Sequence, residues 1–594
     1  MKDYLGEILF LLGPAKAKLP GMLLLFLLSS SLDLLGLGLI GPYVTLITDP
    51  QALDGRLGVL LGSMPLPNEF ESLVVALGVI LVAVFMFKAA VAIMINRRVI
   101  GFGFSEQARL RALLMDSYQR MPYTELLRRN SSEYLYAIQQ LTHQFAGSVV
   151  MPGLRTISEL LAVVAIMTLL AWQNPHALGI LIALLVLMVV LYDRIFRRNL
   201  KVYGERANQA ATGMVRGVNE GIEGLKEIRI LGRESHFYQA VKRHAEDYSS
   251  YSTRSQAIAA APRYILESLL VTFIVLLVLT SLAFEGDLKT LMPTLGVFGL
   301  ASLRLLPAAT GLSANLLQLR FNRDAVRRLH HDLKEVASMR VPGVPGGTEE
   351  TQQQFDELVL DNISFAYPGA STPALENISI RVRAGESIGL VGPSGSGKTT
   401  LVDVILGLLE PKSGTVKFNN AYLIDALNSW RASVAYLPQQ VFLADDSLRK
   451  NVALGEHDSD IDEGRLLKAL HQARLDELTA QLPHGVETML GERGVRLSGG
   501  QRQRVALARA FYYGRSVLVM DEATSALDND TEREIADEIR RLKGAKTMIV
   551  IAHRLTTVQH CDRIYRLERG KIAQFGSPEE VIGQPSVVTL CRDV

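Results

Sequence analysis

The chain has 594 residues, of which 48% are hydrophobic and 21% are charged, and its formal net charge is +2. So balanced a charge gives no sign of nucleic-acid binding, which depends on a basic surface. With a mean hydropathy of +0.20, the composition instead predicts a large membrane-embedded part. The two cysteines, Cys561 and Cys591, have no metal-ligand companion, and a reducing compartment suits them.

Six apolar segments are each long enough to cross roughly 30 Å of hydrocarbon. An even number of crossings returns the chain to its starting side, and the distribution of Lys and Arg agrees. The segments expected in the cytoplasm are rich in arginine, whereas the expected outer loops offer only Arg56 and Lys289. Residues 1–18 lack the small-residue cleavage site of a signal peptide, so the first segment is expected to be a true crossing. The six segments lie near residues 19–47, 72–95, 149–171, 176–196, 264–284 and 291–318.

The second half of the chain contains a phosphate-binding loop. Residues 392–400 read Gly-Pro-Ser-Gly-Ser-Gly-Lys-Thr-Thr, which has the pattern G-x-x-x-x-G-K-[ST], and they stand between a predicted buried strand and a predicted helix. Glycines let the backbone N–H groups turn toward phosphate oxygens at the positive end of that helix. Lys398 is expected to reach the β- and γ-phosphates of a nucleotide, and the Thr399 hydroxyl to bind Mg²⁺. The loop residues expected to bind the nucleotide are Gly392, Ser394, Gly395, Gly397, Lys398, Thr399 and Thr400.

A second motif, Leu497-Ser-Gly-Gly-Gln501, follows further along the chain and precedes a helical pattern rich in Arg and Ala. With its companions it gives residues 356–590 a resemblance to an ABC-type ATPase, because the other motifs of that family stand in the same order. In chain order, these companions are Tyr367 in the position that stacks on adenine, Gln439 in the Q-loop, Asp521 and Glu522 after the Walker B strand, Asp528 in the D-loop and His553 in the switch position.

The resemblance implies a role for each of these residues in ATP hydrolysis. Phosphoryl transfer to water needs a positioned metal, neutralised charge and an oriented water. Thr399, Gln439 and Asp521 would hold Mg²⁺. Glu522 would be the general base, with Gln439 and His553 as further catalytic residues. In this family ATP lies between the phosphate-binding loop of one ATPase and the signature motif of another, so the residues that would complete the site from a second copy are Ser498, Gly499, Gly500, Gln501 and Asp528.

The order of six crossings followed by one ATPase resembles an exporter-type half-transporter. We therefore expect a membrane all-α domain of type IV exporter-like architecture in residues 1–322, a linker in 323–354, and a P-loop α/β ATPase domain in 355–594. The polar helical stretches between crossings resemble the long cytoplasmic extensions of that family, with short helices expected near 122–129 and 220–228. Because neither half-site is degenerate, two identical chains are expected to pair. The resemblance places the protein in the bacterial inner membrane with its ATPase in the cytoplasm.

Charged residues inside the predicted crossings point to the substrate. Each costs about 2.5–3.5 kcal/mol at the bilayer centre, so such residues usually face a cavity or a partner. At about 1.5 Å per residue, the four cations among them lie roughly 20–30 Å from the outer face, where we expect a cationic cavity for an anionic head group. Alternatively, the i,i+4 pairs Arg155 with Glu159 and Arg263 with Glu267 neutralise each other, whereas Lys88 and Arg304 have no such local partner. The seven charged residues are Asp33, Lys88, Arg155, Glu159, Arg263, Glu267 and Arg304.

The membrane half contains the stretches Met121-Pro-Tyr123, Asn130-Ser-Ser132, 224–232, Pro262-Arg263 and Arg304-Leu-Leu-Pro307. These stretches resemble the lipid-linked oligosaccharide flippase of bacterial protein N-glycosylation. An outer segment, 51–71, matches the external helix of that family. The resemblance implies ATP-driven flipping of a polyprenyl-pyrophosphate-linked oligosaccharide. Related half-transporters export other lipids, such as lipid A, or drugs or peptides, and these stay as alternatives, whereas the crossings exclude a soluble ABC ATPase.

Overall fold

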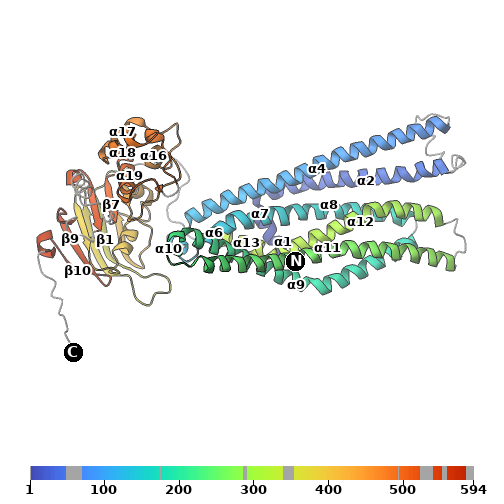
Figure 1. The fold of residues 1–594 in the computed structure, drawn as a ribbon, viewed down its shortest axis with the longest axis horizontal. Coiled ribbons are helices and arrows are strands. Elements are labelled where there is room, and N and C mark those ends of the chain that lie inside the picture. The colour runs from blue at the N-terminus through green and yellow to red at the C-terminus, as the bar shows by residue number, and fades with distance from the viewer. Residues whose placement is uncertain are drawn as a thin grey trace, which may run out of the picture. The chain divides into compact units, whose positions relative to one another are not determined.

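The computed structural model divides the chain into two compact units (Figure 1). The helical unit comprises Met1–Gln119 and Arg129–Met339, and the α/β unit comprises Arg120–Arg128 and Arg340–Val594. The division at Met339 falls inside the segment 323–354 that the sequence assigns to the linker. The structure describes residues 2–48, 70–173, 175–284, 291–338, 353–491, 494–521, 540–551 and 558–582, so most of the outer segment 51–71 lies outside the described residues.

Within the described ranges, the helical unit contains six long helices, and each contains all or nearly all of one of the six apolar segments. Four stretches are long and apolar enough by length and composition to cross a membrane: Asp3–Gly36, Glu71–Arg120, Ser131–Ala171 and Glu234–Leu276. This confirms the expected all-α membrane half. The six helices are α2 (Leu19–Thr48), α4 (Phe70–Arg120), α8 (Met151–Gln173), α9 (Pro175–Glu223), α11 (Glu234–Phe284) and α12 (Leu291–Phe321).

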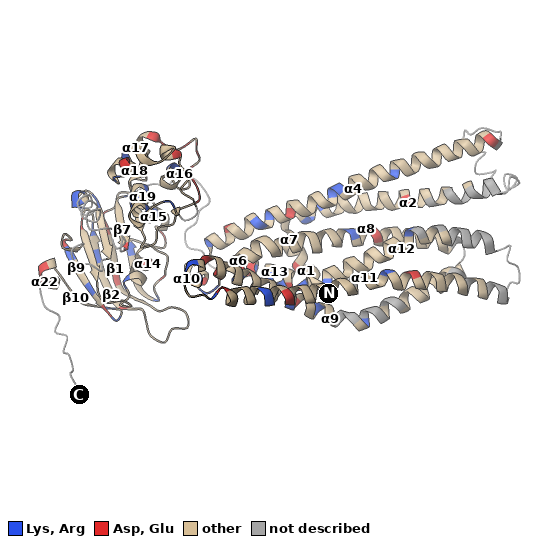
Figure 2. Ribbon diagram, viewed as in Figure 1, with Lys and Arg blue, Asp and Glu red and all other residues tan. Residues whose placement is uncertain are grey.

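Three of these helices are much longer than a bilayer requires. Helices α4 and α11 have 51 residues each and α9 has 49, so at about 1.5 Å per residue each extends well beyond roughly 30 Å of hydrocarbon. In the described parts of the helical unit, charged residues are frequent around α10 and α13 (Figure 2). Gly204 brings α9 against the end of α12, because a Cβ atom there would overlap the carbonyl oxygen of Phe321.

Short helices lie before, between and after the long ones. The structure places α5 (Tyr123–Leu126) and α10 (Leu225–Ile230) where the sequence predicts short cytoplasmic helices. The segment expected as a linker begins as α13 (Arg323–Ser338), a regular 16-residue helix of the helical unit. The remaining short elements are α1 (Lys2–Leu12), η1 (Gly13–Lys18), α6 (Ser131–Tyr136), α7 (Thr142–Phe145) and the π-helical turns η3 (Ala137–Leu141) and η4 (Ala146–Val150).

In its described residues, the α/β unit has an antiparallel sheet of order β2-β1-β4-β5 and a larger sheet of order β10-β9-β3-β8-β7-β6. In the larger sheet every neighbouring pair is parallel except β9 with β10. The strands are β1 (Glu357–Phe365), β2 (Leu375–Arg383), β3 (Ser387–Val391), β4 (Ser413–Phe418), β5 (Ala421–Tyr422), β6 (Val434–Leu437), β7 (Val517–Asp521), β8 (Thr547–Ile551), β9 (Arg563–Glu568) and β10 (Lys571–Gly576).

The larger sheet forms the core of the α/β unit. Every residue of β3, β7 and β8 is buried, as expected for apolar runs in a parallel sheet that is covered on both faces. Trp430 is fully buried in one apolar cluster, and a second cluster includes buried residues of α16, α17 and α19. The helices of this unit are α14 (Lys398–Ile405), α15 (Leu427–Ser433), α16 (Leu448–Val452), α17 (Glu463–Gln472), α18 (Asp476–Gln481), η5 (Gly485–Glu487), α19 (Gly499–Tyr512) and α22 (Pro578–Ile582).

Parallel strand order determines which loops meet. The carboxyl ends of parallel strands lie at one edge of a sheet, and that edge is the usual place for a ligand site in such folds. The phosphate-binding loop follows β3, Gln439 lies two residues after the end of β6, and Asp521 is the last residue of β7. The fold thus gathers three separate motifs of the sequence at one edge.

Candidate nucleotide site and charge cluster of the membrane helices

The phosphate-binding loop has a backbone that requires glycine. Gly392 has φ +149° and Gly397 has φ +102°, values that side-chain-bearing residues rarely adopt. A side chain would also clash at these positions, because a Cβ atom at Gly392 would overlap the carbonyl oxygen of Leu567. At Gly397 it would lie 2.7 Å from the carbonyl oxygen of Ala374. The loop therefore passes close to neighbouring backbone and turns into α14 in the way that phosphate cradles do.

Lys398 and Thr399 begin α14 with opposite environments. Lys398 is buried, and its Nζ donates hydrogen bonds to the carbonyl oxygens of Gly392 and Pro393 at 2.9 and 3.0 Å. Its ammonium group thus lies over the phosphate-binding loop, where it is predicted to contact the phosphates. Thr399 is exposed at the helix start, so a metal ion can reach it from outside.

Thr400 and Tyr367 contact each other beside this loop. The two hydroxyl oxygens lie 3.2 Å apart, and Thr400 is buried. The Thr400 hydroxyl is thus held beside Tyr367. The Tyr367 ring packs edge-on against Phe365 with centroids 5.1 Å apart. Tyr123 of α5 packs against the same apolar core as Tyr367, so α5 lies beside the predicted adenine-stacking residue within the α/β unit.

Asp521 lies in a group of side chains that the sequence did not reveal in full. It is nearly buried at the end of β7, and Tyr436 of β6 donates a hydrogen bond to its Oδ2 at 3.3 Å. Asp403 of α14 is close enough to interact electrostatically with Asp521. Burial, followed by the negative charge of Asp521, raises the pKa of Asp403 to about 6. The structure places Gln439 in an exposed position after β6.

Asp403 was detectable from the sequence, whereas Tyr436 was not. Asp403 follows Thr399 by four residues, which places both on one face of a helix. Tyr436 approaches Asp521 because β6 pairs in parallel with β7, with Tyr436 opposite Val519. Sequence spacing alone does not supply that register.

Three predicted site residues, Glu522, Asp528 and His553, lie outside the described residues. The two strands that precede them are described, and Asp521 at the end of β7 pairs with Ile551 at the end of β8. The two strands therefore end level with each other at the edge that carries the phosphate-binding loop.

The signature motif caps α19. Ser498 is exposed and accepts a hydrogen bond from the backbone N–H of Gln501 at 3.2 Å, while the Gln501 side chain accepts one from the N–H of Ser498 at 2.8 Å. This reciprocal capping box fixes the helix start, and burial of Leu497 and Gly500 anchors it. Ser498 and Gly499 thus lie at the positive end of a 14-residue helix, which favours an anionic ligand.

In the helical unit, one carboxylate joins two of the four predicted substrate cations. Asp33 of α2 contacts Lys88 of α4 at 2.6 Å through Oδ1 and Arg304 of α12 at 3.0 Å through Oδ2. The Asp33 side chain is 1% exposed, compared with 23% for Lys88 and 37% for Arg304. As the sequence predicted, neither Lys88 nor Arg304 pairs with a residue at i,i+4; instead they share Asp33, a partner that is distant in sequence.

The other two cations have different environments. Arg263 pairs with Glu267 at 3.2 Å, as the i,i+4 spacing allows, and both side chains are exposed. Arg155 donates to Asn96 of α4 at 3.3 Å, while Oε2 of Glu159 is buried and has no hydrogen-bond partner among the described residues. The structure therefore brings Lys88 and Arg304 together at Asp33 but does not join Arg155 or Arg263 to them.

A cavity of about 440 Å³ lies between α8, α9, α11 and α12. Its lining is almost entirely apolar and includes Leu160, Leu181, Leu266 and Leu305. Leu305 follows Arg304 directly on α12, and Arg304 itself is not among the lining residues.

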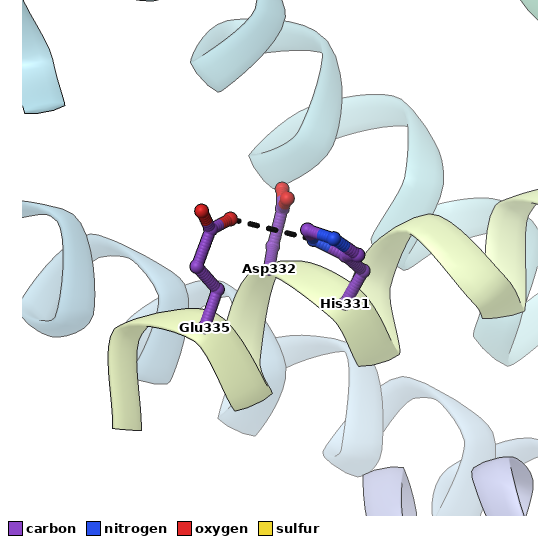
Figure 3. Close-up of side chains that lie close together, drawn as sticks. All are labelled: His331, Asp332 and Glu335. Carbon is purple, nitrogen blue, oxygen red and sulfur yellow. Dashed lines mark ion pairs between the residues drawn. The ribbon is translucent and has the colours of Figure 1, made fainter. Parts of the chain in front are cut away.

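A second charged cluster lies on α13 and was not predicted. His331 Nδ1 lies 3.3 Å from Glu335 Oε2, and Asp332 projects beside them (Figure 3). Arg129 donates to Asp332 at 3.0 Å and to Glu335 at 2.5 Å, and Tyr118 donates to the other oxygen of Asp332 at 2.8 Å. These partners account for the carboxylates, so we assign the cluster to ion pairing rather than to a metal.

Comparisons with known proteins bear on both halves of the chain. Residues 375–525 match the family described as ABC transporter, and residues 21–292 match the ABC transporter transmembrane region. The chain is 33% identical over 433 residues to the ATP-dependent lipid A-core flippase of Cupriavidus metallidurans, covering 72% of this chain and 71% of that protein. It is 31% identical over 479 residues to the flippase of the same name in Cupriavidus pinatubonensis, covering 80% of each.

A solved structure gives the same architecture. The structure of a bacterial Atm1-family ABC exporter with ATP bound matches with a TM-score of 0.77, at 21% identity, over 97% of this chain and 98% of that chain. At that identity the match shows the fold alone. It confirms the expected order of a helical membrane domain fused to an ATPase domain.

Proposed function

Because the chain belongs to the ABC transporter family, we propose that it uses ATP to flip a phosphorylated glycolipid across the inner membrane. ATP hydrolysis coupled to transport, and a multi-pass inner-membrane location with a cytoplasmic ATPase domain, follow from the family. The observation that carries the lipid proposal is the group formed by Lys88, Arg304 and Asp33 inside membrane helices. Two cations against one anion leave an excess positive charge, which suits a phosphate.

The nucleotide site is proposed to hold Mg·ATP through the residues at the sheet edge. The glycine backbone and Lys398 form a cradle for phosphates. The hydroxyl of Thr399, the carboxylate of Asp521 and the side-chain oxygen of Gln439 are oxygen donors, which Mg²⁺ prefers. The donor set therefore fits this metal, which when bound would neutralise charge on the phosphates. Tyr367 would stack on adenine.

For the hydrolytic step we assign Glu522 as the general base and His553 as the contact to the γ-phosphate. Support comes from the motif order, since Glu522 follows Asp521 directly and His553 follows the end of β8 by two residues. Gln439 would orient the attacking water. A base placed beside that water is what hydrolysis requires.

We propose a homodimer as the working form. The signature residues Ser498 to Gln501 and the D-loop residue Asp528 would complete the site of a second copy. Exposed apolar residues on and beside α10 support pairing: Ile230 is 76% exposed, and Ile222 and Leu231 are similarly exposed. Tyr123 of α5, by contrast, packs on the α/β unit of its own chain. Exposed apolar side chains that cluster on a cytoplasmic helix mark a contact surface for a partner chain.

The substrate proposal names two candidates. The relatives named as lipid A-core flippases favour a lipid A-type glycolipid, which reverses the order that the sequence suggested. A polyprenyl-pyrophosphate-linked oligosaccharide is the second candidate, supported by the resembling stretches around Pro262 and Arg304. Both combine phosphate with long apolar chains, and the apolar cavity beside α12 suits such chains.

The test uses the full chain reconstituted in proteoliposomes. Fluorescent lipid A-type and polyprenyl-pyrophosphate-linked glycolipids are placed in matched vesicles, and flipping is followed with Mg·ATP. Lys398→Ala is the control that lacks ATP use. We expect ATP-dependent flipping of at least one glycolipid, and the faster of the two identifies the class. ATP-dependent movement of an uncharged drug or a peptide, with neither glycolipid moved, would overturn the proposal.

A further inference from the structure

We propose that Asp33 determines the charge specificity of the membrane site: it holds Lys88 and Arg304 together and reduces their combined charge from two to one. This rests on the proposed function, in which these cations meet the phosphate of a lipid. Asp33 lies on α2 of the helical unit and is not among the residues of the nucleotide site. The residue is thus a positioning residue rather than one that contacts the substrate.

Burial separates the roles of the three side chains. Asp33 is 1% exposed, so its carboxylate lies behind the cations, whose side chains are 23% and 37% exposed. Each Asp33 oxygen contacts a different cation, Oδ1 to Lys88 and Oδ2 to Arg304. An incoming anion therefore reaches the cations first and does not need to displace the carboxylate.

The contacts also fix where the two cations lie. Lys88 Nζ is 5.1 Å from the Phe85 ring centroid, and Phe85 in turn lies against Gly36 of α2, where a Cβ atom would be 3.3 Å from the ring. Arg304 uses Nη2 for Asp33, and its Nε is buried without a hydrogen-bond partner among the described residues. Without the carboxylate, two like charges from α4 and α12 would repel each other inside the membrane.

A single excess charge has a consequence for transport. A site that carries two full positive charges would bind a doubly charged phosphate tightly and release it slowly, whereas transport requires both capture and release. With Asp33 present, discrimination between singly and doubly charged head groups is moderate. The net charge of this site is therefore predicted to determine how strongly the protein prefers a doubly charged head group to a singly charged one.

The experiment varies the charge of the site in single steps. Asp33→Asn raises the net charge from +1 to +2, and Lys88→Gln lowers it to 0, while Asp33→Glu keeps it at +1. Two synthetic lipids with the same apolar anchor and sugar are compared, one with a phosphodiester and one with a pyrophosphate diester. The readout is the ratio of the concentrations that give half-maximal stimulation of ATPase activity in nanodiscs.

We expect the preference for the pyrophosphate lipid to rise about tenfold in Asp33→Asn and to fall by a similar factor in Lys88→Gln, with Asp33→Glu unchanged. A purely structural ion pair would change stability or the response to both lipids alike, leaving the ratio constant in all variants. That constant ratio overturns the inference. If Asp33→Asn does not fold, a comparison of Lys88→Gln with Asp33→Glu still tests whether the ratio follows the net charge of the site. A wild-type protein that responds to neither lipid would instead count against the proposed function.

Discussion

Arg129 forms an ion pair with Asp332 of α13 at 3.0 Å, and Tyr118 donates a hydrogen bond to the other oxygen of the same carboxylate. Tyr118 precedes α5 in the chain and Arg129 follows it, so Asp332 joins the two flanks of this short helix. Helix α13 in turn leads toward the ATPase domain. The Asp332 carboxylate thus connects α13, which precedes the ATPase domain in the chain, with the residues on either side of α5.

Asp332→Ala is expected to weaken the link between lipid binding and ATP hydrolysis. Loss of hydrogen bonds to charged partners costs about 1.5–3 kcal/mol in general, and Arg129 retains Glu335 as a partner. We therefore expect a folded protein with a lower midpoint of thermal unfolding and a smaller ratio of lipid-stimulated to basal ATPase activity. Lys334→Ala, at an exposed position of the same helix, is the matched control. Equal stimulation in both variants would show that the cluster only stabilises the fold.

Glu522→Gln is expected to retain ATP binding and lose hydrolysis. The substitution removes the proposed base and leaves the phosphate-binding loop intact, and a positioned base contributes about 10²–10⁴-fold to rate. Binding is measured with a fluorescent ATP analogue and hydrolysis by phosphate release. Turnover above roughly a tenth of wild type would remove Glu522 from the base role. Lys398→Ala, which should lose binding as well, separates the two steps.

The signature motif is expected to act on the site of the partner chain. Lys398→Ala inactivates a phosphate-binding loop, and Ser498→Arg places a bulky cation at the exposed start of α19. Mixed dimers of the two variants contain one composite site with neither change, so they should regain ATPase activity that each variant alone lacks. Activity is measured on dimers purified through two different affinity tags. Folded mixed dimers without any recovery would show that the site is not shared or that both sites must be intact.

Asp403 is expected to make the α/β unit less stable as the pH rises. Its pKa is raised to about 6 by burial and by Asp521, from an ordinary value of 3.8. An acid with a raised pKa in the folded state stabilises that state below the unfolded pKa, and this contribution is lost as the pH rises through about 6. Asp403→Asn should therefore unfold at a higher temperature than wild type at pH 7.5 and at a similar temperature at pH 3.5, which lies below the ordinary value of 3.8.

Trp430 reports this unfolding, because it is fully buried in the α/β unit. In a Trp172→Phe background it is the only tryptophan of the chain. After allowance for solvent screening of a partly exposed group, the gain at pH 7.5 should be about 1 kcal/mol, or roughly 2–4 °C. Asp425→Asn, at an exposed position of the same unit, is the control. A gain that is the same at both pH values would contradict the assignment.

The sequence predicted the local form of the phosphate-binding loop and of the start of α19 better than it predicted the membrane charge cluster, for a physical reason. The phosphate-binding loop and the capped start of α19 are local, so their residues are neighbours in the chain and their spacing determines their geometry. Arg304 and Asp33 are 271 residues apart, and Arg129 and Asp332 are 203 apart. Such partners meet only through helix packing, which hydropathy does not encode. The i,i+4 pair of Arg263 and Glu267 was visible in the sequence because it lies on one helix.

Removing all charge from the group around Asp33 is expected to abolish lipid flipping while basal ATP hydrolysis continues. Neutralising Lys88 and Arg304 alone would leave Asp33 as an unpaired buried carboxylate, and removing the partners of a buried charge typically costs about 3–5 kcal/mol. The clean variant is therefore the triple change Asp33→Asn, Lys88→Gln and Arg304→Gln, in which no charge is left unpaired. Flipping is measured per ATP hydrolysed, in vesicles that contain equal amounts of folded protein. Undiminished flipping of an anionic glycolipid by this variant would show that the group only holds α2, α4 and α12 together.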